Sequence, residues 1–267
     1  IMKTTLSPNL LDNFILKTDS YKLSHFKQYP QGTEKVYSYF ESRGGQFTET
    51  VFFGLQYLIK KHLTGQVITM EKINQAEKII AAHMGPGNFN RQGWEYIIEE
   101  HGGYLPLEIK AVPEGMVING KNVLMTVENT DPECFWLTNY AETILTHLWA
   151  PITVATQSRE FKKIIAKYLE KTGGPEALAG LPFKLHDFGY RGVSSVETAA
   201  SSGAAHLLNF AGSDTLAAVC LLMDYYNCAE MPAFSIPASE HSTITSWGRE
   251  GELAAMENML DAYPTGL

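Results

Sequence analysis

Three short segments in the second half of the chain concentrate residues that could do chemistry. They are residues 186–192 (HDFGYRG), 211–214 (AGSD) and 237–242 (PASEHS). The first puts Phe188 and Tyr190 beside Arg191, a combination that suits a flat heteroaromatic ligand together with a phosphate. The alternative is a packed turn in which both aromatic rings belong to the core.

Asp214 and His241 are the candidate reactive side chains of the other two segments. Asp214 could accept a hydrogen bond from a ligand amide, but an aspartate that opens a helix is usually an N-cap, and the two roles are compatible. His241 stands between Glu240 and Ser242, as a tuned nucleophile or proton carrier would, although a lone histidine is more often structural. The residue types alone leave both interpretations open at each position.

Several reaction classes are disfavoured because their partner motifs are missing. The DFG triplet at 187–189 lacks the HRD-type and glycine-rich loops of a kinase, and no GxSxG elbow of a serine hydrolase occurs. No second histidine lies at ligand spacing from Glu240 and His241. The three cysteines form no CxxC pair, which disfavours a disulfide framework or zinc site and favours a reducing compartment. We therefore expect no metal held by protein side chains.

The second half of the chain reads as three strand–loop–helix units that would position these segments. Strands are expected at 183–187, 208–210 and 233–236. Each is followed by a helix: the first runs from a capping box of Ser194 and Glu197 to Leu208, the second from Asp214 to Tyr226, and the third contains Leu253, Met256 and Leu260. Such units imply parallel strands, in an open sheet or a (β/α) barrel. The loops after parallel strands open on one face, so the three segments are predicted to form one site.

The first half mixes helical and strand patterns. A strand is expected at 36–40, followed by helices across 52–62, from the cap Thr69 to His83, and at 94–98. Strands at 105–109 and 117–127 come next, with a hairpin turn at Asn119-Gly120. A helix from Asp131 to Trp149 is then broken by Pro151, a further helix runs to Lys171, and a loop is expected at 171–180. The fold class is therefore α/β, with an N-terminal α+β domain over residues 1–150 and a second domain over residues 151–267.

Composition limits the partners. The 267 residues are 45% hydrophobic and carry a net charge of −8, which argues against a general binder of nucleic acid or anionic membrane. No apolar run reaches the ~18 residues of a membrane span, and the start lacks a signal-peptide core. We expect a cytoplasmic protein that binds neither nucleic acid nor membrane and whose arginines are placed locally.

Several ordered motifs resemble those of nicotinamide phosphoribosyltransferases. They are HDFGYRG followed by VSSVETA, NFAGSDT, SIPASEHSTITSWG, and near the start TDSYKLSHFKQYP and KVYSYFESRG. The resemblance runs from about Asn13 to the end. It implies transfer of phosphoribosyl from phosphoribosyl pyrophosphate to the ring nitrogen of nicotinamide, which gives nicotinamide mononucleotide and pyrophosphate in the salvage route of NAD biosynthesis. It also implies the first part of an irregular (β/α) barrel of the type II phosphoribosyltransferase kind after the N-terminal domain.

The resemblance further implies a site shared by a homodimer. Phe188 would stack on one face of the pyridine ring, and Tyr21 from a second subunit would stack on the other, with Asp19 beside it. Asp214 would accept the carboxamide N–H, and this carboxylate would repel nicotinate. These implied contacts describe the base-binding side of an active site.

The phosphate side is implied by fewer residues. Arg191 would contact the ring edge and a phosphate, Arg43 would contact phosphates across the dimer, and His241 would be phosphorylated by ATP as a coupled substrate. Mg²⁺ would accompany phosphoribosyl pyrophosphate and ATP and shield the pyrophosphate leaving group. The enzyme's task would be to stabilise charge on the ribose and on the departing group.

Two other functions remain open from the sequence. One is a nicotinate phosphoribosyltransferase, and the other is a non-catalytic protein that binds a pyridine ligand. Family members are considerably longer than this chain, which stops at Leu267 after three units and lacks their later phosphate-binding segments. A truncated chain, a proteolytic fragment or a split protein would explain this, and we expect little or no transferase activity from the chain alone.

Overall fold

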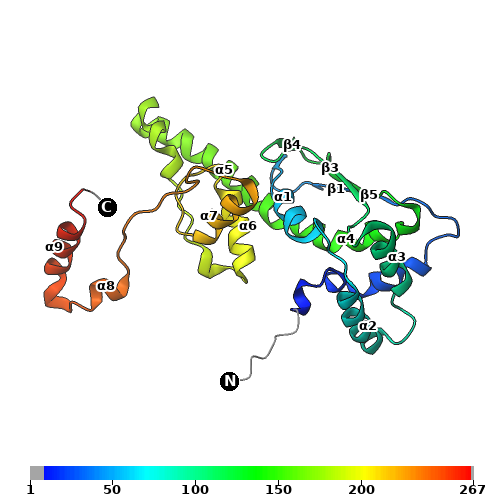
Figure 1. The fold of residues 1–267 in the computed structure, drawn as a ribbon. Helices are drawn as coiled ribbons and strands as arrows, with labels where there is room; N and C mark the ends of the chain where they lie inside the picture. Colours follow the sequence, from blue (N-terminus) through cyan, green and yellow to red (C-terminus); the bar gives the residue numbers. More distant parts are fainter. Residues whose placement is uncertain (1–8, 266–267) are drawn as a thin grey trace, which may run out of the picture.

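The computed structural model describes residues 9–265. An N-terminal region of strands and helices (blue to green) is joined through the long helix α5 (Trp149–Gly173) to a C-terminal helical region (yellow to red) (Figure 1). The predicted mixture of helix and strand is confirmed at this coarse level. Within residues 9–265, no helix is long and apolar enough to cross a membrane.

A three-stranded antiparallel sheet underlies the N-terminal region. Its order is β1 (Tyr37–Glu41), β5 (Val123–Asn129) and β3 (Leu107–Ala111), and a separate two-stranded sheet pairs β2 (Glu49–Val51) with β4 (Val117–Asn119). Side chains alternate between the two faces of a strand. Phe40, Met125 and Val127 are accordingly buried, whereas Tyr37 and Tyr39 face solvent. The sheet therefore has one face for the core and one for water.

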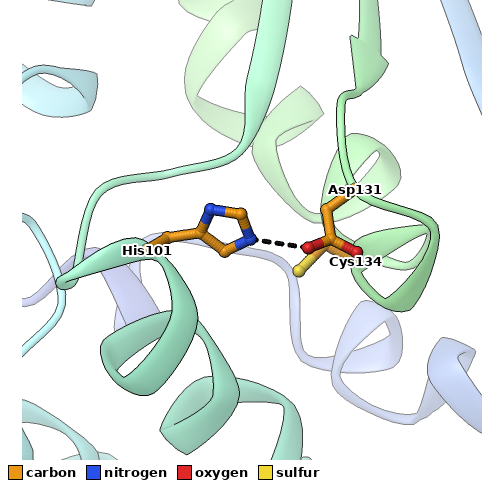
Figure 2. Close-up of side chains that lie close together, drawn as sticks. All are labelled: His101, Asp131 and Cys134. Carbon is orange, nitrogen blue, oxygen red and sulfur yellow. Dashed lines mark hydrogen bonds and ion pairs between the residues drawn. The ribbon is translucent and has the colours of Figure 1, made fainter.

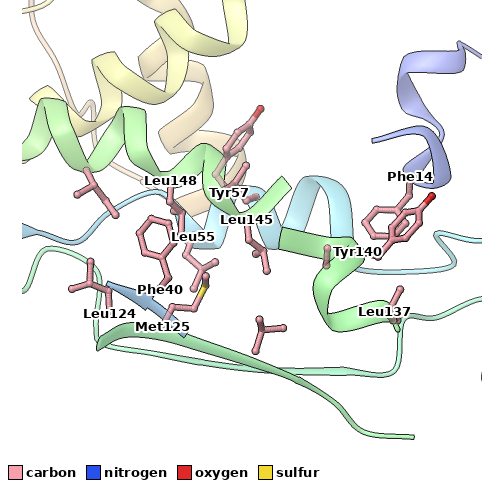
Figure 3. Close-up of a cluster of buried hydrophobic side chains, with 14 of the residues drawn as sticks. Phe14, Phe40, Leu55, Tyr57, Leu124, Met125, Leu137, Tyr140, Leu145 and Leu148 are labelled. Atoms are coloured by element: carbon pink, nitrogen blue, oxygen red, sulfur yellow. The ribbon is translucent and has the colours of Figure 1, made fainter. Parts of the chain in front are cut away.

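The core lies between this sheet and α4 (Leu137–Leu145), which continues through a 3₁₀ turn at Thr146–Leu148 into α5. Leu145 and Leu148 lie over Phe40, Leu124 and Met125 (Figure 3). Each of these side chains is at most 7% exposed. Burial of a leucine or phenylalanine contributes about 1.5–3 kcal/mol, so this cluster stabilises the junction of sheet and helix.

The other helices of this region follow their sequence signals closely. Thr69 caps α2 by accepting a hydrogen bond from the Lys72 N–H (3.3 Å), as predicted. α3 ends at Gly102, whose φ of 60° is the left-handed conformation that favours glycine. The elements are η1 (Leu10–Asp12), η2 (Phe14–Leu16), η3 (Ser20–Lys27), α1 (Leu55–Leu58), the π-helical turn η4 (Ile59–Leu63), α2 (Met70–Met84), α3 (Arg91–His101) and η5 (Pro132–Cys134).

Two predictions for this region are wrong. The turn at Asn119-Gly120 does not close a hairpin, because β4 pairs with β2 whereas β5 pairs with β1 and β3. Lys121 takes a positive φ of 65° after it, and its N–H donates to the Ser42 carbonyl, which leads the chain from one sheet to the other. The predicted interruption lies before Pro151 rather than at it, because a 3₁₀ turn at Thr146–Leu148 separates α4 from α5 and Pro151 lies in the first turn of α5.

The C-terminal region is built on α6 (Val196–His206) and α7 (Leu216–Tyr226), which pack against each other, while α6 also packs on α5. Small residues make the close approach possible. A Cβ on Gly203 would lie 2.8 Å from the Ala218 methyl carbon. Beyond them, α8 (His241–Thr245), the 3₁₀ turn η9 (Arg249–Gly251) and α9 (Glu252–Ala262) extend away from the rest of the chain (Figure 1).

The predicted strands of this region are wrong in extent. Residues 183–187 begin at the end of a 3₁₀ segment, η7 (Pro175–Phe183), which also replaces much of the predicted loop at 171–180. Residues 208–210 form a turn, and 233–236 contribute one bridging residue. What remains of the predicted pairing is two isolated parallel bridges, Asp187 to Ser213 and Gly212 to Phe234. The predicted parallel direction is thus confirmed at two points, without continuous strands.

Two predicted helix caps are also wrong. Ser195 rather than Ser194 caps α6 by accepting from the Thr198 N–H (3.1 Å), so Glu197 takes no part in a capping box. Thr215 rather than Asp214 is the N-cap residue of α7, and its side chain makes no capping hydrogen bond. Both polar side chains, Glu197 and Asp214, are therefore available for other contacts.

Candidate functional site

A cavity of about 1000 Å³ opens between α5, α6 and the loops that follow the two parallel bridges. Its lining brings together four of the predicted site residues, which come from all three polar segments: Phe188, Arg191, Asp214 and His241. The prediction that the three segments share one face is therefore confirmed for these residues.

Backbone hydrogen bonds join the first two segments to each other and the second segment to Phe234, which precedes the third. The Asp214 N–H donates to the Asp187 carbonyl (2.7 Å), and the Ser213 N–H donates to the Phe234 carbonyl (2.9 Å). Gly212 lies between them, where a Cβ would sit 2.6 Å from His186 Nδ1. A contact that short is repulsive, so the imidazole can occupy this position only beside a glycine.

Phe188 projects from the loop that follows the first bridge. The Asp187 carboxylate accepts from the Gly189 N–H (3.0 Å), which turns the chain directly after Phe188, and a 3₁₀ turn follows at Tyr190–Gly192. Phe188 is 71% exposed while lining the cavity, so the alternative that its ring packs in the core is wrong. An exposed ring at a cavity wall is free to stack on a ligand.

Asp214 also lines the cavity, with a side chain that is 53% exposed. Its Oδ1 accepts from Ser235 Oγ and lies 2.8 Å from His186 Nε2. The hydrogen bond from Ser235, followed by that from His186, lowers the pKa of the Asp214 carboxyl group below its usual range. Asp214 is therefore an oriented carboxylate rather than a helix cap.

Sequence reasoning missed His186 and Ser235 as members of the site. His186 opens the HDFGYRG segment, and Ser235 lies two residues before the PASEHS segment. Their contacts with Asp214 join positions 28 and 21 residues apart. The signal that could have revealed them was the presence of a polar residue at the end of each predicted strand, facing the same edge.

His241 is the exposed first residue of α8 and also lines the cavity. Glu240 caps this short helix together with Thr243, and Ser242 Oγ donates to the Glu240 carboxylate. The neighbouring carboxylate thus serves the helix rather than the imidazole. His241 is left open to solvent at the cavity, where it can meet a large substrate.

A buried pair of side chains supports the cavity wall. Ser158 on α5 lies 2.8 Å from His206 Nδ1 on α6, and His206 Nε2 lies 3.0 Å from the Leu185 carbonyl. A carbonyl only accepts, so Nε2 carries the proton and Nδ1 accepts from the Ser158 hydroxyl. Burial lowers the pKa of His206, which keeps the ring neutral and this pattern intact.

The structure does not bring Asp19, Tyr21 or Arg43 into this cavity. Asp19 accepts a hydrogen bond from Thr143 Oγ1 (2.9 Å) at the start of η3. Tyr21 is 61% exposed, and Arg43 lines a separate cavity of about 460 Å³ beside β1 and α4. Within one chain, four of the predicted site residues therefore share the cavity and the other three lie outside it.

Within residues 9–265, one group of three potential metal ligands converges, His101, Asp131 and Cys134 (Figure 2). It lies outside the cavity. His101 Nε2 lies 2.7 Å from Asp131 Oδ2, which also accepts from Tyr96. Burial raises the pKa of the Cys134 thiol to about 12, so it is protonated and a poor ligand. We interpret the group as a brace between α3 and η5.

The cavity itself does not fit a magnesium ion held by protein. Magnesium requires oxygen ligands in near-octahedral geometry. Asp187, Asp214 and Glu240 line the cavity, but among the described residues no three potential ligand side chains converge there. Any magnesium at this site would arrive on substrate phosphates.

Comparisons with known proteins agree with this geometry. Residues 13–109 match the model of the nicotinamide phosphoribosyltransferase N-terminal domain, and residues 183–263 match that of the nicotinate phosphoribosyltransferase (NAPRTase) family. The second match contains Phe188, Arg191, Asp214 and His241. Both matches are to families of pyridine phosphoribosyltransferases.

Individual relatives narrow the class. The chain is 51% identical over 254 residues to a nicotinamide phosphoribosyltransferase of Xanthomonas campestris pv. campestris, with 95% of this chain and 53% of the relative covered. It is 36% identical to the enzyme of that name from Acinetobacter baylyi, with 93% and 52% covered. Its sequence therefore corresponds to the N-terminal portion of nicotinamide phosphoribosyltransferase, and the chain spans about half the length of the curated relatives it matches.

The fold has a counterpart among solved structures. A crystal structure of human nicotinic acid phosphoribosyltransferase superposes with a TM-score of 0.56 at 18% identity, covering 86% of this chain and 40% of that one. At this identity the likeness concerns the fold alone. It supports a mixed α/β arrangement like that of the NAPRTase family.

Proposed function

We propose that this chain forms the base-binding part of a nicotinamide phosphoribosyltransferase. The reaction transfers phosphoribosyl from phosphoribosyl pyrophosphate to nicotinamide, giving nicotinamide mononucleotide and pyrophosphate in the salvage of NAD precursors. The observation that carries the proposal is the convergence of an exposed ring, Phe188, and an oriented carboxylate, Asp214, on one cavity. The relatives named above support nicotinamide as the base.

The pyridine ring stacks on Phe188, and its carboxamide N–H donates to Asp214. Because Ser235 and His186 hold Asp214 in its ionised form, the carboxylate accepts from an amide and repels the carboxylate of nicotinate. A protein whose carboxylate reads the amide in this way selects nicotinamide, which favours the proposal over a nicotinate phosphoribosyltransferase.

The chemistry that follows is a displacement at the ribose. The ring nitrogen of nicotinamide forms a bond to the anomeric carbon while the bond to pyrophosphate breaks, and pyrophosphate leaves with the electron pair. Arg191, which lines the cavity, faces the phosphate groups and stabilises their charge. Magnesium brought in on the substrate phosphates would supply part of the charge neutralisation at the leaving group.

His241 is the acceptor of the γ-phosphoryl group of ATP in this proposal. An imidazole nitrogen bonds to the γ-phosphorus, the bond to the β-phosphate oxygen breaks, and ADP leaves. Hydrolysis of the phosphohistidine then couples ATP to product formation. The support is that His241 is exposed and lines the same cavity as Phe188 and Asp214.

The homodimer completes the site in this proposal. Tyr21 from a second subunit covers the free face of the pyridine, Asp19 lies beside it, and Arg43 reaches the phosphates across the interface. The support is that these residues lie apart from the cavity of their own chain and that the Tyr21 side chain is 61% exposed.

The larger architecture is part of the same proposal. The N-terminal α+β domain spans residues 1–150, and residues 151–267 are the first part of an irregular (β/α) barrel, in a cytoplasmic enzyme. The support is that this boundary falls at the start of α5 and that two parallel bridges join the C-terminal segments in chain order.

Separate titrations of the chain with nicotinamide, nicotinate, phosphoribosyl pyrophosphate and ATP by isothermal calorimetry test the function. We expect nicotinamide to bind at least tenfold more tightly than nicotinate, and ATP to label His241. A protein that takes the base but never labels with ATP would be a non-catalytic pyridine binder. Equal or tighter binding of nicotinate would contradict the proposal.

A further inference from the structure

Glu197 lies where α6 contacts the N-terminal region, and the proposed function gives it no role. It is the second residue of α6, directly after the loop that carries Phe188 and Arg191. Its partners come from α1 and η4 in the N-terminal region. Tyr57 OH donates to Glu197 Oε1 (2.7 Å), and Lys61 Nζ lies 3.3 Å from Oε2.

The cluster around Glu197 is closed by further hydrogen bonds. Lys61 Nζ also donates to Tyr57 OH (2.6 Å), and His62 Nε2 lies 3.4 Å from Glu197 Oε1. Lys17 Nζ lies 3.0 Å from His62 Nδ1. An ammonium group only donates, so Nδ1 accepts and Nε2 carries the proton that points to Glu197.

The cluster is more than a surface ion pair. The side chains of Tyr57 and His62 are 5% and 6% exposed, so two of the donors to Glu197 lie in the protein interior. The hydrogen bond from His62 is the largest of several contacts that lower the pKa of the Glu197 carboxyl group. The Glu197 side chain is itself 43% exposed, but because two of its donors are fixed in the interior it is held in one orientation more firmly than a carboxylate whose partners are all at the surface.

The position of Glu197 gives this anchor a consequence for the site. The loop 187–195 is held at its first end by the parallel bridge of Asp187 to Ser213. Its second end continues into α6, whose first turn is joined to the N-terminal region through Glu197. The loop that carries Phe188 is therefore fixed at both of its ends.

We propose that Glu197 is a positioning residue that, through Tyr57, Lys61 and His62, fixes the start of α6 on the N-terminal region and thereby the loop that presents Phe188 and Arg191. The effect on ligand binding rests on the proposed function, whereas the effect on the loop does not. The two can fail independently.

Glu197→Gln tests the proposal, with Lys61→Met as a second variant that leaves Glu197 in place. A matched control is Glu77→Gln, because Glu77 and its partner Arg91 have the same side-chain exposures, 43% and 34%, as Glu197 and Lys61. Glu77 lies on α2, away from the cavity. Hydrogen–deuterium exchange measures the exchange rates of the backbone amides of residues 188–195 in the ligand-free protein, and calorimetry measures the affinity for nicotinamide.

We expect exchange in residues 188–195 to rise severalfold in both test variants, with nicotinamide bound about fivefold more weakly. Exchange of the β1–β5–β3 sheet should be unchanged, which separates positioning from general destabilisation. The double variant should show no faster exchange and no weaker nicotinamide binding than the more strongly affected single variant, since both substitutions remove the ion pair between Glu197 and Lys61. The Glu77 control should resemble the wild type throughout.

Unchanged exchange in residues 188–195 in folded Glu197→Gln and Lys61→Met proteins would overturn the proposal. Faster exchange with unaltered nicotinamide affinity would overturn it as well. If the wild-type chain binds no nicotinamide, the proposed function has failed, and loop exchange alone then supports or overturns the positioning role.

Discussion

His186 Nε2 lies 2.8 Å from Asp214 Oδ1, although the two residues are 28 positions apart in the chain. The pair brings the first residue of one polar segment onto the last residue of the next. Ser235, two residues before the third segment, donates to the same carboxylate oxygen. The Asp214 carboxylate is thus oriented by residues from two other parts of the chain, and these contacts lower the pKa of its carboxyl group.

Asp214→Asn should weaken nicotinamide binding tenfold or more and narrow the preference over nicotinate. A hydrogen bond to a charged group contributes about 1.5–3 kcal/mol, and the amide no longer repels a ligand carboxylate. Calorimetry with both ligands measures the change. Asp224→Asn, an exposed aspartate on α7 outside the cavity, is the control. An undiminished preference for nicotinamide would show that Asp214 does not read the amide.

Phe188→Leu should weaken nicotinamide binding about three- to tenfold, because leucine keeps apolar bulk but loses a stacking contact of ~0.5–1.5 kcal/mol. The same substitution at Phe183 is a suitable comparison. Phe183 is 57% exposed and does not line the cavity. Equal losses at both positions would argue against stacking on Phe188.

His241→Asn should abolish transfer of label from γ-labelled ATP to the chain, because no other imidazole replaces it at that position. Acid-labile, alkali-stable protein-bound phosphate is the measurement, since phosphohistidine has that stability. His147→Asn, which changes an exposed histidine elsewhere, should label like the wild type. Persistent labelling of the His241 variant would assign the phosphoryl acceptor to another residue.

Lowering the pH should destabilise the chain through His206. Its folded pKa lies below the ordinary value of 6.5. The unfolded chain therefore binds the extra proton first, and the free energy of unfolding falls as the pH drops below about 6.5. Denaturant melts at pH 7.5, 6.5 and 5.5 measure this slope.

In the same melts, His206→Gln should be less stable at pH 7.5 because its contacts with Ser158 and Leu185 are disrupted. It should also lose part of the slope between pH 7.5 and 5.5, while His147→Gln retains it. A slope that is the same in wild type and His206→Gln would rule out this histidine as its source.

Local patterns predicted much of the N-terminal region. The cap at Thr69, the stop at Gly102 and the strand predicted at 36–40 depend on neighbours in sequence, and each is confirmed. Strand pairing depends on distant segments instead. The Asn119-Gly120 turn has hairpin chemistry, yet its two flanking strands find better partners in β2 and in the β1 and β3 pair.

The candidate site was likewise predicted only in the part that depends on local sequence. Residue types and spacing were enough to predict that Phe188, Arg191, Asp214 and His241 share a face. They could not reveal that Asp214 leaves the capping position to Thr215, because its partners Ser235 and His186 lie in other segments. They also could not distinguish short bridges from full strands, since pairing length is set by packing between the segments.

The position of His186 in the cavity depends on the absence of a Cβ atom at Gly212. One added methyl group at this position would press on His186 Nδ1 from 2.6 Å and tilt the ring away from Asp214. The carboxylate would then be less well aimed, although no ligand-contacting side chain had been altered. In the proposed function, the choice between nicotinamide and nicotinate would thus depend on a glycine that contacts no ligand, and engineering that preference could begin with a single added carbon at Gly212.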